Sequence, residues 1–174
     1  MPGEKSNEER SGLRVRSARS ADVSRLAPKL RQADREEIRA ATGEAPGEVL
    51  ERGFYCSDPC YSIVDGCDEP LALFGVVPKD GGAGIVWLLG SDELLAYPVA
   101  FSRLSRSWID RLHERYSVLW NRVDARNQVH VRWLQWCGFT IHRTIAAFGV
   151  ECRPFHEFSR GRDGACPTRV AEMT

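Results

Sequence analysis

The sequence lacks an excess of charge of either sign, because 24 Lys and Arg residues balance 24 Asp and Glu residues in a chain of 174. A neutral chain produces no general electrostatic field that would attract nucleic acid or an anionic membrane. We therefore expect no nucleic-acid partner, except through a local patch of arginine.

Long hydrophobic runs are also missing. No apolar run approaches the roughly 18 to 20 residues that a membrane-spanning helix requires. The first ten residues, MPGEKSNEER, contain no apolar stretch of the kind that a signal peptide carries. The expectation is a protein without a membrane partner that is made and kept in a cytoplasm.

The cysteines lack the C-x-x-C spacing of zinc knuckles. Disulfides are typical of exported proteins and of small proteins with little core, so free thiols in a reducing compartment are the simplest interpretation. A zinc site that combines three cysteines with histidines is the alternative, but the spacing disfavours it and we expect no metal. The cysteines are Cys56, Cys60, Cys67, Cys137, Cys152 and Cys166.

The length and composition fit one globular domain, since 43% of the residues are hydrophobic and 28% are charged. A second full domain does not fit in this length. Residues 1–12 and 159–174 are polar and show no periodicity, which predicts flexible tails at both ends. The folded domain is therefore expected over residues 13–158.

The first half of the domain is predicted to open with a strand followed by helices. Leu13 and Val15 alternate with arginines as in a half-buried strand, and Ser20 is the expected cap of the first helix. Further helices are expected over 33–42 and over 46–52, which begins with proline. Short apolar runs separated by turn clusters then predict antiparallel strands over 61–64, 71–77 and 85–89.

The second half returns to helical periodicity after Pro98. A stripe of apolar side chains predicts one long helix with a buried face. A strand over 119–123, a helix over 127–137 and strands over 139–145 and 147–152 follow, so the predicted order is β-α-α-β-β-β-α-β-α-β-β. The stripe consists of Phe101, Leu104, Trp108, Leu112 and Tyr116.

This order, with a helix that opens on Asn127 and a Gly-Phe pair at Gly138 and Phe139, resembles the GCN5-related N-acyltransferases. The resemblance implies an α/β (α+β) fold with a mixed, mostly antiparallel central sheet flanked by helices. Those enzymes commonly carry a tyrosine seven positions after the asparagine, as the general acid for the departing CoA thiolate. Leu134 stands at that position and has no proton to give, so we predict no catalytic residue.

The loop that holds the CoA diphosphate in this family also departs from the pattern. The family form Q/R-x-x-G-x-G/A supplies backbone N–H groups at a helix N-terminus, whereas the corresponding residues here are Leu89, Gly90, Ser91 and Asp92, followed by Glu93. A carboxylate about 4 Å from a phosphate is repelled by about 1 kcal/mol in water and by about 4 kcal/mol in a partly buried site. We therefore expect no cofactor, and acetyl-CoA only if the enzyme is active.

Three segments resemble more closely an acyltransferase-like family of tailed bacteriophages, which includes an internal-virion or head-morphogenesis protein of short-tailed phages. The likeness runs from about Leu13 to Phe148. It implies a protein of virion assembly, in the host cytoplasm or the virion, whose partners are other phage structural proteins or further copies of itself. The segments are residues 70–76, 87–92 and 119–124, together with Asn127, His130, Arg132, Leu134, Gly138 and Phe139.

Each of these residues also has a purely structural interpretation. Asn127 fits a helix cap, and Gly138 fits a left-handed glycine that ends a helix. Lone histidines such as His130 and His142 are mostly packed or surface groups. The arginines of the long helix (Arg103, Arg106, Arg111 and Arg115) are either solvated or a docking face for an acidic protein or packaged DNA.

Two functions therefore compete. The first is a phage assembly factor that uses an inactive acyltransferase scaffold as an interaction module. The second is an active acyl-CoA-dependent N-acetyltransferase that acts on a protein or small-molecule amine, with Glu69, Glu93 or Tyr97 as acid or base.

Overall fold

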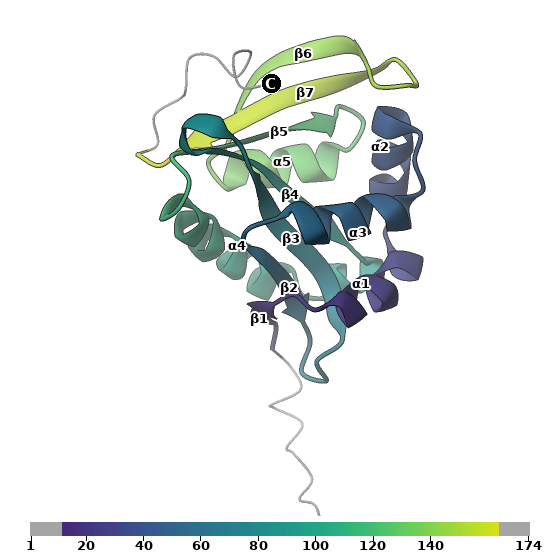
Figure 1. The fold of residues 1–174 in the computed structure, drawn as a ribbon, viewed down its shortest axis with the longest axis vertical. Coiled ribbons are helices and arrows are strands. Elements are labelled where there is room, and N and C mark those ends of the chain that lie inside the picture. Colours follow the sequence, from purple (N-terminus) through teal and green to yellow (C-terminus); the bar gives the residue numbers. More distant parts are fainter. Residues whose placement is uncertain (1–11, 164–174) are drawn as a thin grey trace, which may run out of the picture.

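A computed structural model describes residues 12–163, which form one seven-stranded sheet flanked by helices (Figure 1). The strand order is β1-β2-β3-β4-β5-β7-β6. The strands are β1 (Arg14–Ser17), β2 (Cys60–Val64), β3 (Pro70–Pro78), β4 (Ala83–Gly90), β5 (Val118–Asp124), β6 (Thr140–Phe148) and β7 (Arg153–Gly161). The α-helices are α1 (Ser20–Leu26), α2 (Gln32–Thr42), α3 (Pro46–Cys56), α4 (Pro98–His113) and α5 (Gln128–Trp136), and the 3₁₀ turns are η1 (Ala27–Lys29), η2 (Asp80–Gly82) and η3 (Asp92–Ala96).

The helices cover both faces of the sheet, with α1 and α3 on one face and α4 and α5 on the other (Figure 1). Successive side chains of a strand point to opposite faces. Leu73 of β3 accordingly packs with α1 and α3, while its neighbour Phe74 packs with α4. The sheet therefore separates two hydrophobic cores.

The only parallel neighbours among the described strands are β4 and β5, and their pairing is short. Their register runs from Ala83–Val118 to Ile85–Trp120, although β4 continues to Gly90 and β5 to Asp124. Just beyond the last pair, the Asn121 side chain donates a hydrogen bond of 2.9 Å to the carbonyl of Val86. The two strands therefore part in the middle of the sheet.

Helix α2 is held against the turn between β6 and β7. The N–H of Glu151 donates to the carbonyl of Ala40 at 3.1 Å, and Arg39 pairs with the Glu151 carboxylate at 3.0 Å. Gly149 has a φ of +69°, and a Cβ there would lie 2.3 Å from the Ala40 carbonyl oxygen. This close approach fixes α2 beside the opening between β4 and β5.

The predicted fold class is confirmed, and the predicted segments match the structure up to β6 with small shifts of their ends. The predicted order has two helices before the second strand, whereas the structure has three, and Ser20 is the first residue of α1 and not its cap, which is Arg19. The third helix is longer than predicted and reaches Cys56. The predicted strand over 147–152 is wrong, since residues 149–152 form the hairpin turn and β7 follows at 153–161. Gly149 and Cys152 both have positive φ angles there, which a continuous strand does not allow.

The chain ends are only partly described. β7 continues to Gly161, so residues 159–161 belong to the sheet and not to the predicted C-terminal tail. Of the remaining predicted tail residues, 1–11 and 164–174 lie outside the described residues. Within residues 12–163 no helix combines the length and the apolar character that crossing a membrane requires.

Candidate functional site

A cavity of about 540 Å³ opens where β4 and β5 part. The neighbouring strand β3 is buried from Pro70 to Val76, whereas residues 85–89 of β4 are all half-buried, although helices flank both strands. Ligand sites are typically open, mostly apolar concavities of this size. An occupant is therefore expected in this space.

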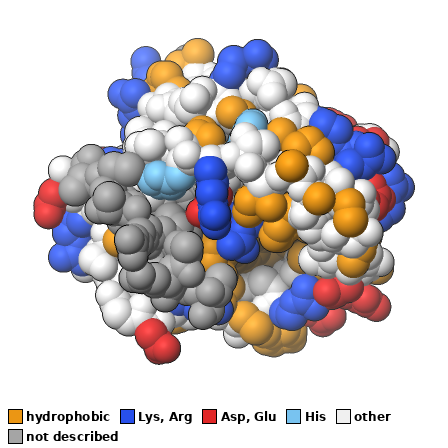
Figure 2. All heavy atoms as spheres, turned by 90° about the horizontal axis from the view of Figure 1, so that it is seen from above, with side chains coloured by type: hydrophobic (Ala, Val, Ile, Leu, Met, Phe, Trp, Pro, Cys, Tyr) orange, Lys and Arg blue, Asp and Glu red, His pale blue; other side chains and the backbone are white. Residues whose placement is uncertain are grey.

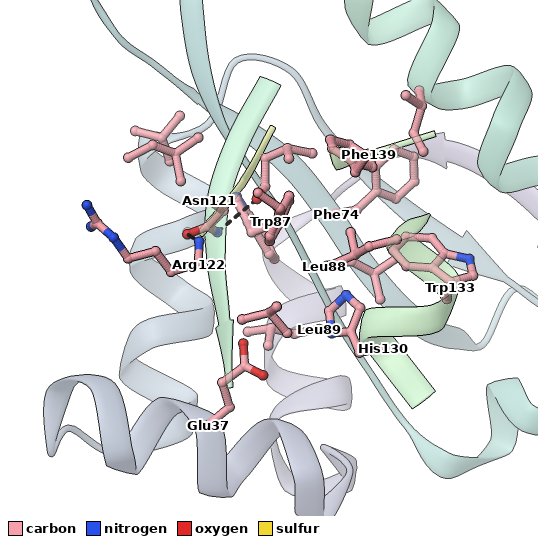
Figure 3. A pocket seen from close by; sticks show the side chains of 18 of the residues that line it. Glu37, Phe74, Trp87, Leu88, Leu89, Asn121, Arg122, His130, Trp133 and Phe139 are labelled. Atoms are coloured by element: carbon pink, nitrogen blue, oxygen red, sulfur yellow. Dashed lines mark hydrogen bonds between the residues drawn. The ribbon is translucent and has the colours of Figure 1, made fainter. Parts of the chain in front are cut away.

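The cavity has walls on both faces of the sheet (Figure 3). On the first face, α2 contributes Glu37 and β4 contributes Trp87 and Leu89, and Figure 3 shows the Glu37 carboxylate rising from α2 toward Leu89. On the second face, α5 contributes His130 and Trp133. The opening therefore passes through the sheet and connects its two sides.

Glu37 is the titratable group best placed for chemistry in this opening. Burial raises the pKa of its carboxyl to about 8, and the nearby charge of Asp34 adds to the rise. Hydrogen bonds from the Asp124 backbone N–H and, at 3.5 Å, from the Asn127 amide oppose this rise by favouring the charged form. A carboxyl with a pKa near the working pH suits a general base.

His130 faces the cavity from the first turn of α5. Burial lowers the pKa of its imidazole to about 3, and the positive charge of Arg31 lowers it further. Its Nδ1 atom is buried and has no hydrogen-bond partner among residues 12–163. The His130 ring is therefore neutral at neutral pH and does not act as a base there. Its Nδ1 atom can form one hydrogen bond with an occupant of the cavity.

The backbone of β4 offers a further polar group to the opening. The N–H and C=O of one strand residue point to the same side, and the side alternates along the strand. The Val86 carbonyl points toward β5, since it accepts from Asn121, so the peptide groups of Leu88 point the same way. Because the β4–β5 register ends at Ile85, β5 gives Leu88 no partner in the described structure.

The backbone at the end of β4 is hydrogen-bonded to residues at the start of α2. The Gly90 N–H donates to the Asp34 carboxylate at 2.9 Å, and the Gly90 carbonyl accepts from the Arg31 N–H at 2.9 Å. The Ser91 N–H donates to the Leu71 carbonyl at 2.8 Å. Two backbone donors of the loop are thus already bonded within the chain, and η3 follows directly.

A second cavity of about 160 Å³ lies beside this loop, near the N-termini of α4 and α5. Its lining includes Arg31, Leu94 and Leu95. Four further lining residues also line the main cavity, so the two spaces are neighbours. The shared residues are Leu88, Phe101, His130 and Trp133.

The residues singled out in the sequence are divided between this site and the framework. Leu89, Leu134 and Phe139 line the main cavity. Asn127 caps α5 by accepting the His130 N–H at 3.3 Å, and Gly138 has the left-handed φ of +87°, so both structural interpretations are confirmed. Asn127 also contacts Glu37, a role that the cap alone did not suggest.

The three predicted acid or base candidates lie elsewhere. The Glu69 carboxylate pairs with Lys29 at 2.9 Å and also with Arg25. The Glu93 side chain is 55% exposed, and Tyr97 packs against the core at the start of α4. None of the three lines the main cavity, as far as the described residues show.

Glu37 was not predicted from the sequence, although a signal for it was present. Asp34, Glu37, Ile38 and Ala41 follow the i, i+3, i+4, i+7 spacing of one helix face. Two carboxylates on the apolar face of a short helix are expensive to bury without partners. Their position on that face would have marked α2 as a site element.

Among the residues that the structure describes, the cysteines and histidines do not cluster. Cys56, Cys60, Cys67, Cys137 and Cys152 are free thiols, and Cys166 lies outside the described residues. Within residues 12–163 no three His, Cys, Asp or Glu side chains form a group that could hold a metal ion. His142 lies on β6 with its Nε2 atom 2.6 Å from the Ser159 hydroxyl.

The arginines of α4 are largely engaged with their own chain. The Arg106 guanidinium lies 4.0 Å from the centre of the Trp136 ring, and that of Arg111 lies 4.7 Å from Trp108. Arg115, predicted as part of the long helix, lies just beyond the end of α4 and pairs with Asp58 at 2.6 Å. In the view of Figure 2, Lys and Arg side chains are scattered among hydrophobic and acidic ones and do not form one field.

Comparison with known proteins identifies the fold. No family model matches the chain, and no curated protein matches it in sequence. Among solved structures, a GCN5-related N-acetyltransferase from Kribbella flavida superposes with a TM-score of 0.64 at 20% identity, over 86% of this chain and 98% of the other. The chain therefore has the GCN5-related N-acetyltransferase fold.

Two further structures with the same fold are named for their substrates. Spermidine N-acetyltransferase from Vibrio cholerae, in complex with CoA and spermine, has a TM-score of 0.63 at 13% identity over 87% of this chain and 96% of the other. Ribosomal-protein-S5-alanine acetyltransferase from Vibrio fischeri has a TM-score of 0.63 at 15% identity over 90% and 97%. At such identities the likeness concerns the fold alone, and the phage family stays a prediction.

Proposed function

We propose that the protein transfers an acyl group from a thioester to an amine in the opening between β4 and β5. The observation that carries this proposal is Glu37, a carboxyl with a pKa of about 8 that lines the cavity where the strands part. The solved structures with this fold include proteins named as N-acetyltransferases, which supports the proposal by analogy.

The reaction needs one proton acceptor near the attacking nitrogen. The amine nitrogen attacks the thioester carbonyl carbon, a C–N bond forms, the C–S bond breaks, and the nitrogen's proton passes to the Glu37 carboxylate. The sulfur leaves as a thiolate, whose ordinary pKa of about 8.5 allows departure without prior protonation. Leu134 supplies no acid, so we expect the thiolate to take its proton from water.

The donor is expected to bind as an extended chain along β4. An added chain can pair with the peptide group of Leu88 as a further strand would, and the smaller cavity beside Phe101 and His130 provides a route to it. The diphosphate of CoA finds fewer free donors here, because the Gly90 and Ser91 amides are bonded within the chain. The donor is therefore recognised through its pantetheine arm.

The test follows release of free thiol from acetyl-pantetheine and from acetyl-CoA in the presence of a panel of primary amines at pH 8. We expect saturable, amine-dependent release that Glu37→Gln slows by at least about a hundredfold. Glu36→Gln is the matched control, because the neighbouring Glu36 accepts from Gln32 and does not line the cavity. Absence of saturable binding of either thioester in calorimetry would contradict the proposal.

A second candidate is the phage assembly factor that uses this scaffold as an interaction module. Two features favour it. The Gly90 and Ser91 amides are already bonded within the chain, which weakens binding of the CoA diphosphate, and Leu134 cannot act as the general acid. Its partners would be other phage structural proteins or further copies of this chain. Mass spectrometry of purified particles and assembly intermediates tests it, and absence from both would count against it.

A further inference from the structure

The main cavity extends well beyond the point where β4 and β5 part. On the α4 face it is lined not only by β4 and β5 but also by Phe74 of β3, Ile63 of β2 and Val15 of β1. Val15 and Ile63 are register partners at the far edge of the sheet. The space therefore runs beneath α4, across the strands, toward β1.

The length of this extension exceeds what an acetyl group needs. Neighbouring strands lie about 4.8 Å apart, so the three intervals from β4 to β1 span about 14 Å. An acetyl group reaches only one C–C bond, about 1.5 Å, beyond its carbonyl carbon. A path of about 14 Å corresponds to a chain on the order of ten carbon atoms.

The wall beneath α4 offers little to a polar occupant. The Ser105 hydroxyl donates to the Phe101 carbonyl at 2.7 Å and accepts from the Trp133 ring N–H at 3.3 Å. Both ends of the Asn121 amide are bonded to the backbone, at 2.9 Å and 2.7 Å. Since buried polar groups need partners, an occupant of this wall should be hydrocarbon.

Aromatic rings form the far part of the wall. Phe74 and Trp108 both line the space, with ring centroids 5.9 Å apart. Leu104 of α4 also lines the space and is half-buried. These side chains present flat apolar surface to a linear chain.

We infer that the space beneath α4 is an acyl-chain pocket, and that the donor carries a linear hydrocarbon acyl group of roughly eight to twelve carbons rather than acetyl. The inference rests on the proposed function, because it takes the thioester carbonyl to lie at the opening between β4 and β5. The chain then points away from Glu37, under α4, toward Val15 and Ile63.

Calorimetry with a series of acyl-pantetheines tests this directly. Each buried methylene should tighten binding about threefold to fourfold, so octanoyl-pantetheine should bind at least about a hundredfold more tightly than acetyl-pantetheine. The gain should end at about ten to twelve carbons. Equal affinity for acetyl and octanoyl donors would overturn the inference.

A space-filling variant sharpens the test. Leu104→Trp should reduce octanoyl binding to the acetyl level and leave acetyl binding unchanged. Val99→Trp is the control, since Val99 is on the same helix, is 62% exposed and does not line the cavity. If Leu104→Trp fails to fold, Ile63→Phe at the far end should shorten the longest accepted chain by a few carbons, and an unchanged chain-length limit would contradict the pocket.

Failure of the two proposals would look different. Chain-length-dependent binding without any thiol release would keep the pocket and reject acyl transfer. Amine-dependent release that is equally fast with acetyl and octanoyl donors would keep acyl transfer and reject the pocket.

Discussion

Asp34 and Glu37 lie one helical turn apart on α2, but their carboxylates have different partners. The Asp34 carboxylate is 3% exposed, pairs with Arg31 at 2.7 Å and accepts the Gly90 N–H at 2.9 Å. Glu37 faces the cavity and accepts from the Asp124 backbone N–H and, at 3.5 Å, from the Asn127 amide, but it has no cation as a partner. One carboxylate ties the end of β4 to α2, and the other is left for an occupant.

The difference shows how one helix serves structure and chemistry at once. Burial raises the pKa of both carboxyls, but Asp34 has a cation and a backbone donor that favour its charged form. A buried carboxyl paired with a cation is a structural group, whereas Glu37, whose two donors are uncharged, is poised to accept a proton. The two should therefore respond to substitution in opposite ways.

The largest expected effect is on catalysis. Glu37→Gln should lower kcat/KM for acyl transfer at pH 8 by at least about a hundredfold, which is the usual contribution of a general base. In the unsubstituted protein kcat/KM should rise with pH to a plateau above the pKa of about 8. Steady-state thiol release from pH 6 to 10 measures both, and a flat profile would argue against Glu37 as the base.

The second effect is on stability. Asp34→Asn should destabilise the protein by about 3 kcal/mol, because it leaves the Arg31 guanidinium unpaired in a mostly buried position. Urea denaturation at pH 7 gives the free energy of unfolding. Glu37→Gln should not destabilise under the same conditions, and equal losses for both variants would remove the distinction between the two carboxyls.

The pH dependence of stability should separate them further. The folded pKa of Glu37, about 8, lies above its unfolded value, so the stability it contributes is present below the unfolded pKa and is lost as pH rises toward 8. One pKa unit is worth about 1.4 kcal/mol, and partial exposure reduces the full shift, so we expect a loss of about 2 to 3 kcal/mol between pH 5 and 8. This loss, measured by denaturation at each pH, should be absent in Glu37→Gln.

The smallest effect concerns Asn127, which caps α5 and donates to Glu37. Asn127→Ala should cost about 1 kcal/mol of stability through the lost cap, whereas Asn127→Ser should retain most of it. Both variants should raise the pKa of Glu37, because both remove the donor to its charged form. Thermal unfolding and the pH profile of thiol release would show whether cap and donor separate in this way.

The sequence predicted the fold because its signals are local. The alternation in β2 to β4, the stripe of α4, the Asn127 cap and Gly138 each depend on a few neighbouring residues. The end of the sheet was harder, since the turn at Gly149 is required by a contact with Ala40 more than a hundred residues earlier. Local sequence spacing cannot predict a contact between residues so far apart in the chain.

The site was predicted only in part for the same reason. The family spacing located Asn127, Leu134 and the loop at Gly90. Glu37 was missed because its importance arises from the parting of β4 and β5, which brings α2 to the opening. The raised pKa of Glu37 is a property of that arrangement and not of the residue type.

The most direct test of the account is the pKa of the Glu37 carboxyl itself. Titration of the carboxyl carbons by ¹³C NMR, with the Glu37 signal assigned by its loss in Glu37→Gln, measures it without any substrate. The account predicts a midpoint of about 8. A midpoint near 4.5, the ordinary value for glutamate, would show that the opening holds a solvated carboxylate and would contradict its role as the base.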